Sequence, residues 1–262
     1  DNTLYTWGRS YLGDNSAVSA RNRATVMDAP VSGIDIKMIS ATNTGTGNSS
    51  YPTYYVLAKN GNLYSMGRNN VRQVGDWTET HRQSWVQPRY TSTTGQVMSN
   101  IKWISPNEHD QSNAAINVIT TDAKLYNWGV NTNNRYMLGR GTTTNVYPGI
   151  PNGPLTDDIL AVETGGHTTM ITMKCTENFG YVGHRIRGSM GNGSGSDVNE
   201  QNFTFATAAV QICGAETIPI VNKITINMNS DGTVCEDGAL TLVPDVPGGT
   251  YSFYTAVPGS PG

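Results

Sequence analysis

Apolar and polar residues alternate along short runs of this chain, and turn-forming residues separate the runs. The segments TYYVLAK (residues 53–59) and INVIT (116–120) have period two and are rich in branched and aromatic side chains. This alternation predicts half-buried β-strands. Further hydrophobic strands are expected at 34–39, 101–104 and 159–162. The chain is therefore expected to be all-β.

A hairpin is predicted where the segment KNGN (59–62) lies between two such runs. Asn-Gly is a strong hairpin signal, because both residues tolerate a positive φ. Short antiparallel sheets are therefore the expected local structure.

One phrase recurs along the chain in four copies: LYTWG (4–8), LYSMG (63–67), LYNWG (125–129) and, degraded, FGYVG (179–183). A second phrase follows each copy: YLGD (11–14), QVGD (73–76), MLGR (137–140) and SMGN (189–192). A proline-marked turn comes later, at Pro30, Pro88 and Pro148, and is missing from the fourth copy. A repeat of about 50 to 60 residues with four short strands cannot bury both faces alone, so it must stack in a ring of blades or a solenoid.

These phrases resemble the repeats of the regulator of chromosome condensation family, and GGHT (165–168) matches the family's glycine-x-x-histidine step. The resemblance covers residues 1–214. It implies a β-propeller, normally of seven blades, of which about four are visible here. Three blades are then expected on the N-terminal side, so that the chain is an excerpt of a longer protein whose targeting signal lies upstream.

Within each repeat, the glycine that ends the first phrase is expected to serve a tight bend or a close approach between blades. The residue before it (Trp7, Met66, Trp128 and Val182) is expected in the core between blades. His167 is interpreted as a hydrogen-bonded residue at a strand start rather than as a catalyst.

The pattern changes after residue 214, where 215–222 reads as a linker and 223–262 as the truncated start of another β-module. The tail resembles immunoglobulin-like modules of large surface proteins from gliding bacteria, with TVCEDGALTL (233–242) and GGTYSFY (248–254) as the matching segments. That resemblance implies export by the type IX secretion system. The segment NMNSDG (227–232) is interpreted as a turn and not as a calcium loop, because Gly238 stands where a calcium loop needs glutamate.

Composition then limits the classes of partner. Charged residues make up 14% of the chain, with a formal net charge of −3 and no run of Lys or Arg. This excludes the electrostatic footprint of a nucleic-acid-binding protein. No apolar run of 18 residues exists, so no membrane insertion is expected. The low charge favours a secreted, cell-surface protein. Cys175 and Cys213 fall in the fourth repeat and Cys235 in the tail; pairing and free thiols both stay open.

Catalytic signatures are absent from the sequence. There is no Gly-x-Ser-x-Gly elbow, no phosphate-binding glycine loop and no His-Glu-x-x-His pair. The adjacent Asp157 and Asp158 read as a solvated turn, and the cysteines and histidines lack metal-ligand spacing. We therefore expect no enzyme, no cofactor and no metal.

Candidate binding residues gather in one loop of the second repeat. Trp77, His81, Arg82 and Trp85 lie between Gly75 and Pro88, and Tyr136 holds a comparable position in the third repeat. Tryptophan, tyrosine and arginine are enriched at interaction hot spots. Two readings stay open, because two of these residues, together with Tyr90, could instead cover the propeller core.

The sequence thus favours a non-catalytic ligand-binding or adhesion module of a large secreted surface protein, with a protein or glycan ligand and secretion-system components as partners during export. The alternative is a module for one specific protein partner, of the inhibitor or exchange-factor type. Catalysis in a central channel would require convergent polar groups that the sequence does not identify.

Overall fold

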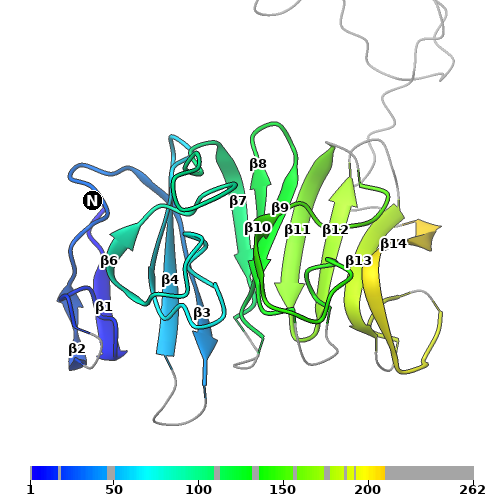
Figure 1. Cartoon of the computed structure of the whole chain (residues 1–262), viewed down its shortest axis with the longest axis horizontal. Helices are drawn as coiled ribbons and strands as arrows, with labels where there is room; N and C mark the ends of the chain where they lie inside the picture. The colour runs from blue at the N-terminus through cyan, green and yellow to red at the C-terminus, as the bar shows by residue number, and fades with distance from the viewer. Residues whose placement is uncertain are drawn as a thin grey trace, which may run out of the picture. The chain divides into compact units, whose positions relative to one another are not determined.

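The computed structural model describes residues 2–16, 19–45, 51–108, 113–131, 136–155, 158–173, 178–185, 188–191 and 193–209. Within them the chain forms antiparallel sheets that follow one another in chain order (Figure 1). The predicted linker, the predicted immunoglobulin-like segment, Asp157 and all three cysteines lie outside the described residues. In this described part, no helix has the length and hydropathy needed to cross a bilayer.

Sheet 1 has two strands, β1 (Tyr5–Arg9) and β2 (Ala20–Val26). Sheet 2 contains β3 (Ile36–Thr44), β4 (Tyr51–Ala58), β5 (Leu63–Gly67) and β6 (Arg82–Val86). Sheet 3 contains β7 (Ile101–Pro106), β8 (Ala115–Thr120), β9 (Leu125–Gly129) and β10 (Val146–Gly149). Sheet 4 contains β11 (Ile159–Gly165), β12 (Thr168–Met173), β13 (Asn178–Arg185) and β14 (Val198–Ala209). In sheets 2 to 4 the spatial order of the strands is the order in the chain.

The predicted all-β class and the five predicted strands are confirmed, with shifted ends: β3 begins at Ile36 rather than at residue 34. The repeat phrase begins in the third strand of a sheet, so the sequence repeat and the sheet are out of phase. The first phrase therefore forms β1 and has only β2 beside it. Three four-stranded sheets and one two-stranded sheet result, where the sequence suggested about four equal blades.

The predicted hairpin at 59–62 forms, but with a four-residue turn between β4 and β5. The Gly61 N–H donates to the carbonyl oxygen of Ala58 (3.0 Å), and the Ala58 N–H donates to that of Asn62 (2.9 Å). Only Gly61 has a positive φ, of 89°. This geometry is a type I turn followed by a glycine bulge, so Asn60 does not need the left-handed conformation that a two-residue turn would impose.

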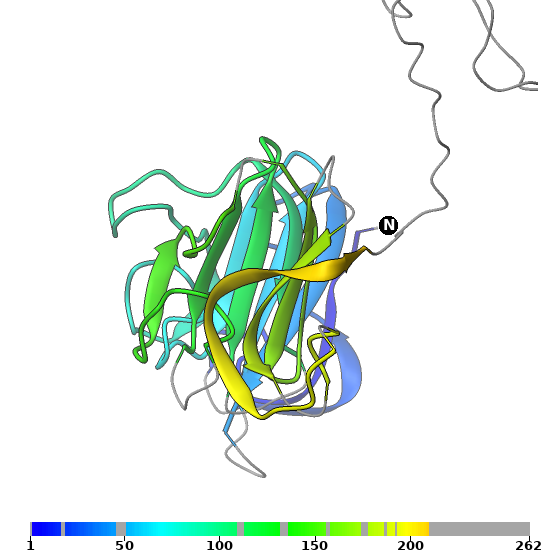
Figure 2. The same ribbon diagram turned by 90° about the vertical axis from the view of Figure 1, so that its right-hand side faces the viewer.

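Hydrophobic clusters lie between successive sheets. One joins Leu4 and Met27 of the first repeat to Val56 and Met66 of sheet 2. Others lie between sheets 2 and 3 and between sheets 3 and 4. Figure 2, turned by 90°, shows the strands of successive sheets one behind another. Neighbouring residues of one strand face opposite sheets.

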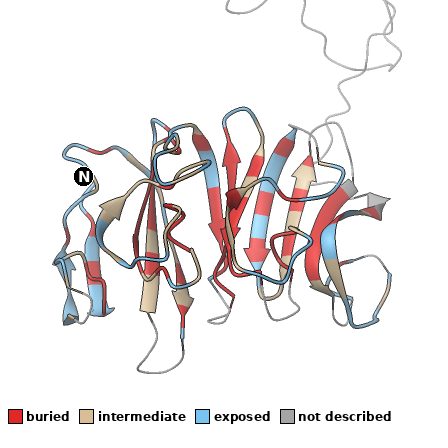
Figure 3. Ribbon diagram, in the orientation of Figure 1, coloured by how far each residue is buried: buried red, intermediate tan, exposed pale blue. Residues whose placement is uncertain are grey.

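Burial follows from this stacking. Every residue of β8 is buried, whereas β2 is exposed along most of its length (Figure 3). The expectation that the 116–120 run is half-buried is therefore wrong, because sheets cover both of its faces. A strand buried on both faces needs apolar or hydrogen-bonded side chains at every position, and Asn117 meets this demand with bonds to Thr164 (2.8 Å) and Thr169 (3.4 Å).

The glycine that ends each first phrase sits at an irregularity in strand pairing. Gly8, Gly67, Gly129 and Gly183 have φ values of 101° to 126°. A Cβ atom on Gly129 would lie 2.1 Å from the Ala114 carbonyl oxygen, and one on Gly67 would lie 2.3 Å from that of Pro52. The predicted tight bend is confirmed. The close approach is to the preceding strand of the same sheet, however, and not to another blade.

Close approach between sheets occurs instead at the glycine of the second phrase. Gly75 has a φ of 81°, and a Cβ atom there would lie 2.8 Å from Nε1 of Trp128. The same indole N–H donates to the carbonyl oxygen of Gln73 (2.9 Å), which also accepts from the Tyr55 hydroxyl (2.7 Å). Trp128 is fully buried. The two phrases of neighbouring repeats thus meet in one contact, in which only glycine leaves room for the indole.

Within a repeat, a side-chain hydrogen bond joins the first phrase to the second. The middle residue of the first phrase is Thr6, Ser65 or Asn127. Each donates to the carbonyl oxygen just before the second glycine: Thr6 to Leu12 (2.8 Å), Ser65 to Val74 (2.7 Å) and Asn127 to Leu138 (2.7 Å). The residue type differs between the repeats but the hydrogen bond is kept, because threonine, serine and asparagine all have short side chains that carry a hydrogen-bond donor.

Replacing Gly75 with alanine is expected to reduce the free energy of unfolding by about 2–4 kcal/mol, through left-handed strain and the clash with Trp128. The matched control is Gly33→Ala, which has a φ of 69° and no atom within 4 Å of the new Cβ. Strain alone should cost the control about 1 kcal/mol. Urea denaturation measures both variants, and equal losses would show that the indole contact adds nothing.

Replacing Ser65 with alanine is expected to cost about 1–3 kcal/mol, because the buried Val74 carbonyl loses its side-chain donor. Ser92→Ala serves as the control, since the Ser92 hydroxyl takes part only in an exposed contact. That change should stay within about 0.5 kcal/mol of the parent. Thermal unfolding followed by circular dichroism distinguishes the two, and an unchanged midpoint for Ser65→Ala would contradict the role given to this bond.

Candidate functional site

The predicted binding residues occupy two neighbouring connections. Trp77, His81 and Arg82 belong to the connection from β5 to β6 and its first strand residue, while Trp85 lies inside β6. Tyr136 lies in the connection from β9 to β10. The structure brings Trp77, His81 and Arg82 together at one end of sheet 2, and we call residues 68–82 the β5–β6 loop.

Asp76 organises this loop. Its carboxylate is 5% exposed and accepts bonds from the Thr78 hydroxyl (2.8 Å) and the Asn69 amide (3.1 Å). Arg82 forms a salt bridge to the same carboxylate, with Nε donating to Oδ2. Because a buried carboxylate is stable only when it is paired and hydrogen-bonded, these contacts hold the loop in one conformation. Arg82 is thus a structural member of the loop.

Trp77 links sheets 2 and 3 through a stack. Its ring lies parallel to that of Tyr147 in β10, with centroids 4.8 Å apart and an angle of 8°. The Arg72 guanidinium lies 4.0 Å from the Tyr147 centroid, and its Nη1 donates to the Asn145 carbonyl oxygen (2.6 Å). The indole N–H of Trp77 donates to the Arg89 carbonyl oxygen (3.0 Å). A partly exposed Arg–Tyr–Trp surface results, in which the sequence pattern indicated Trp77 but neither Arg72 nor Tyr147.

His81 closes the other side of the loop. Its Nδ1 accepts the backbone N–H of Asn69 (3.0 Å), and its ring meets Tyr11 edge-on at 6.0 Å. Tyr11 in turn contacts Tyr51, over which Arg68 lies at 4.6 Å. Burial and the nearby Arg68 charge lower the pKa of His81, so its ring is neutral at neutral pH and keeps Nδ1 as an acceptor. The β5–β6 loop thus meets a ring from the connection between β1 and β2.

Trp85 and Tyr136 do not join this group. The Trp85 indole N–H donates to the Asp28 carbonyl oxygen (2.8 Å), and its ring packs against the cluster between sheets 1 and 2. Tyr136 is 8% exposed and has a positive φ of 54°. The alternative in which aromatic residues cover a hydrophobic core describes Trp85 well.

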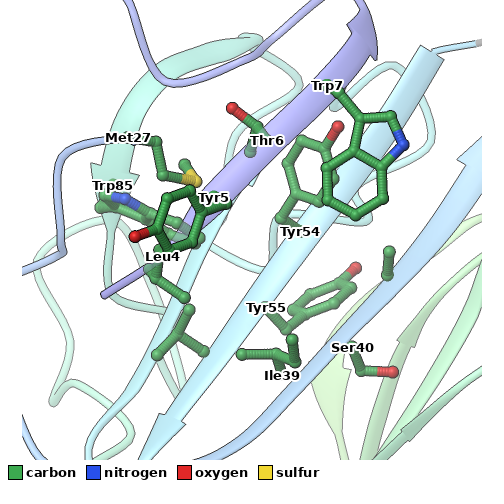
Figure 4. Close-up of a pocket in the computed structure, with 12 residues that line it drawn as sticks. Leu4, Tyr5, Thr6, Trp7, Met27, Ile39, Ser40, Tyr54, Tyr55 and Trp85 are labelled. Carbon is green, nitrogen blue, oxygen red and sulfur yellow. The ribbon is translucent and has the colours of Figure 1, made fainter. Parts of the chain in front are cut away.

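A second surface feature is an apolar cavity of about 370 Å³ between β1 and sheet 2 (Figure 4). Trp7, Ile39, Tyr54 and Trp85 line it, together with Leu4. The side chains come from β1, β3, β4 and β6. In sheets 2 to 4, the first two strands occupy the position that corresponds to this cavity. Sheet 1 lacks these two strands within the described residues.

Equivalent positions in the repeats show the effect of those two strands. Ile39 is 67% exposed, whereas its counterparts Ile104 and Val162 are 2% and 3% exposed. Trp7 is 64% exposed, whereas Trp128 is fully buried. Burial of the residue before the first-phrase glycine is confirmed for Met66, Trp128 and Val182, and it is wrong for Trp7. Trp7 has no preceding sheet within the described residues to pack against.

Comparison with known proteins shows a likeness of fold to solved β-propeller structures. The sequence matches no protein-family model and no curated protein. Its fold is similar to that of human WBSCR16 (14% identity, TM-score 0.52), with 76% of this chain and 44% of that chain covered. It is also similar to a chain in the crystal structure of Kap60 bound to yeast RCC1 (Prp20), at 16% identity and a TM-score of 0.52. This match covers 78% of this chain and 46% of that chain. The fold is therefore similar to part of an RCC1-type β-propeller, and the chain spans less than half the length of either matched chain.

The contrast between Ile39 and Ile104 gives a direct test. Ile104→Ser should cost about 2–5 kcal/mol, because it empties a filled core position. Ile39→Ser should change stability by less than about 0.5 kcal/mol, as at an exposed site. Chemical denaturation of residues 1–262 measures both, and a large loss in Ile39→Ser would mean that this face is already covered in solution.

Proposed function

We propose that this chain is a non-catalytic binding module, which recognises a protein or glycan ligand through the β5–β6 loop and the adjoining side of sheet 3. The observation that carries the proposal is the partly exposed stack of Arg72, Tyr147 and Trp77. Tryptophan, tyrosine and arginine dominate the energetics of interfaces, and side chains that existing contacts already hold in place lose little conformational entropy on binding. The Asp76 network supports this reading, because it fixes the loop before any ligand arrives.

We further propose that the module belongs to a large secreted surface protein and serves in adhesion. The support is the low charge and the tail pattern in 223–262, which resembles an immunoglobulin-like start and implies type IX export. Fractionation of the native host, with and without that secretion system, tests this part separately. Retention inside the cell only when the system is deleted would support it, and unchanged export would overturn it.

The arrangement of sheet 1 supports a larger ring. We infer that β1 and β2 are the outer half of a blade, which two further strands complete beside Ile39, and that the whole protein has seven blades. In such a protein Trp7 would be buried like Trp128. Acrylamide quenching of tryptophan fluorescence, compared between Trp7→Phe and the parent in longer versions of the protein, reports whether Trp7 is shielded.

A second candidate is a module for one specific protein partner, of the inhibitor or exchange-factor type. The similar yeast propeller, RCC1 (Prp20), is described in complex with a protein, Kap60. A single tight protein partner and no affinity for surfaces would favour this candidate over adhesion.

The test is a screen of the purified chain against glycan arrays and host surface proteins, followed by substitution. Trp77→Ala and Arg72→Ala should each weaken the detected binding by about 30-fold or more, as at a hot spot. Trp103→Ala is the matched control, since this tryptophan of β7 is 42% exposed and lies outside the β5–β6 loop. Equal affinity of Trp77→Ala and Trp103→Ala would remove the loop from the binding site, provided circular dichroism shows both folded.

A further inference from the structure

Two histidines face each other across sheet 4. His167 directly precedes β12, and His184 lies in β13. The His184 N–H donates to the His167 carbonyl oxygen (2.8 Å), so their backbones are held in register. Their Nδ1 atoms are 3.3 Å apart, and their ring centroids are 5.5 Å apart. The backbone bond places the two imidazoles side by side, and their Nδ1 atoms lie within hydrogen-bond distance of each other.

A carboxylate fixes the protonation of one ring. Nε2 of His184 lies 2.5 Å from Oδ1 of Asp197, and the His184 side chain is 14% exposed. Because a carboxylate accepts a hydrogen bond, we assign the ring proton to Nε2 of His184. Its Nδ1 then presents a lone pair toward His167. Metal-binding histidines commonly have this arrangement, in which the second nitrogen donates to a carboxylate that orients the ring and raises its basicity.

We propose that His167 and His184 bind one Zn²⁺ ion through their Nδ1 atoms, with water at the remaining positions. Zinc bonds to histidine nitrogen are about 2.0–2.1 Å long, so two such ligands of a tetrahedral ion lie about 3.3–3.4 Å apart. Adjacent ligands of a square-planar ion at the same bond length would lie about 2.9 Å apart. The observed separation of 3.3 Å fits the tetrahedral ion. When zinc is bound, the neutral His167 ring would carry its one proton on Nε2, so that Nδ1 keeps its lone pair and both ligands are neutral imidazoles.

The surroundings suit an open metal site. Both histidines line a cavity of about 480 Å³ together with Glu163 and Ser189. Among the residues that the structure describes, no three metal-binding side chains converge on one point. The proposed site therefore has two protein ligands and coordinated water. An oxygen ligand from outside the protein can replace that water.

Bound zinc would cross-link two strands of sheet 4. It would tie the start of β12 to β13, and Asp197 would extend the restraint to the strand that follows, β14. Ligands that bind only the folded state raise stability in proportion to the logarithm of their concentration. The effect should fall in acid, because protons compete with the metal for the two nitrogens.

The experiment uses residues 1–262 without a polyhistidine tag, in calorimetric titration with ZnCl₂ and in thermal unfolding with and without the metal. We expect one saturable site per chain and a rise in the unfolding midpoint. His167→Ala and His184→Ala should each weaken binding by at least about tenfold, and Asp197→Asn by about 10–100-fold, as for outer-shell partners. Asp122→Asn is the matched control for Asp197→Asn, because Asp122 is an exposed carboxylate in the turn between β8 and β9, outside sheet 4, and this variant should bind zinc as the parent does.

A spectroscopic measurement on the parent protein keeps the proposal testable if a variant fails to fold. Co²⁺ in place of Zn²⁺ should give the intense visible absorption of a tetrahedral site, and added Zn²⁺ should abolish it. The absence of saturable zinc binding would overturn the proposal, as would equal binding by the parent and a folded His184→Ala. Octahedral cobalt spectra would also count against it.

Discussion

The contact between Trp128 and the segment Gln73–Gly75 is the constraint on which the stacking of the sheets depends. The indole fills the space left by a glycine, and its N–H satisfies a buried carbonyl oxygen. Both halves of this contact are needed. An alanine at Gly75 would collide with the ring, and a residue without a donor at position 128 would leave one bond to the Gln73 carbonyl unmade. Because the contact joins the second phrase of one repeat to the first phrase of the next, it sets the spacing between sheets 2 and 3.

Hydrogen bonds inside each repeat place the two phrases for that contact. Thr6, Ser65 and Asn127 differ in size and shape, yet each holds the carbonyl that precedes the second glycine. Polar bonds also run between the first strands of neighbouring sheets, where the Thr42 hydroxyl donates to the Asn107 carbonyl oxygen (2.6 Å) and the Asn107 amide to that of Gly166 (3.1 Å). The loops at this end are therefore attached to a scaffold that cannot shift without breaking buried bonds.

That rigidity connects the fold with the proposed activities. The Arg72–Tyr147–Trp77 stack is shared between sheets 2 and 3, so its geometry depends on how those sheets dock. The His167–His184 pair, with Asp197 beside it, lies within sheet 4 and depends on the register of its own strands. A substitution at Gly75 should therefore disturb the proposed binding surface more than the proposed metal site. Only the binding surface depends on the distance between sheets 2 and 3.

The sequence by itself determined the all-β class, the repeat, the main strands and the bend at each first-phrase glycine, because alternation and glycine spacing are local properties of the chain. It also identified Trp77, His81 and Arg82 as neighbours, since they lie in one short loop. Only the tertiary structure decided which glycine lies against the next sheet and which partners complete the stack. Arg72 and Tyr147 are 75 positions apart and meet only when the sheets pack. It also decided that Trp7 is exposed while Trp128 is buried, because burial depends on whether a neighbouring sheet is present and not on the phrase that contains the residue.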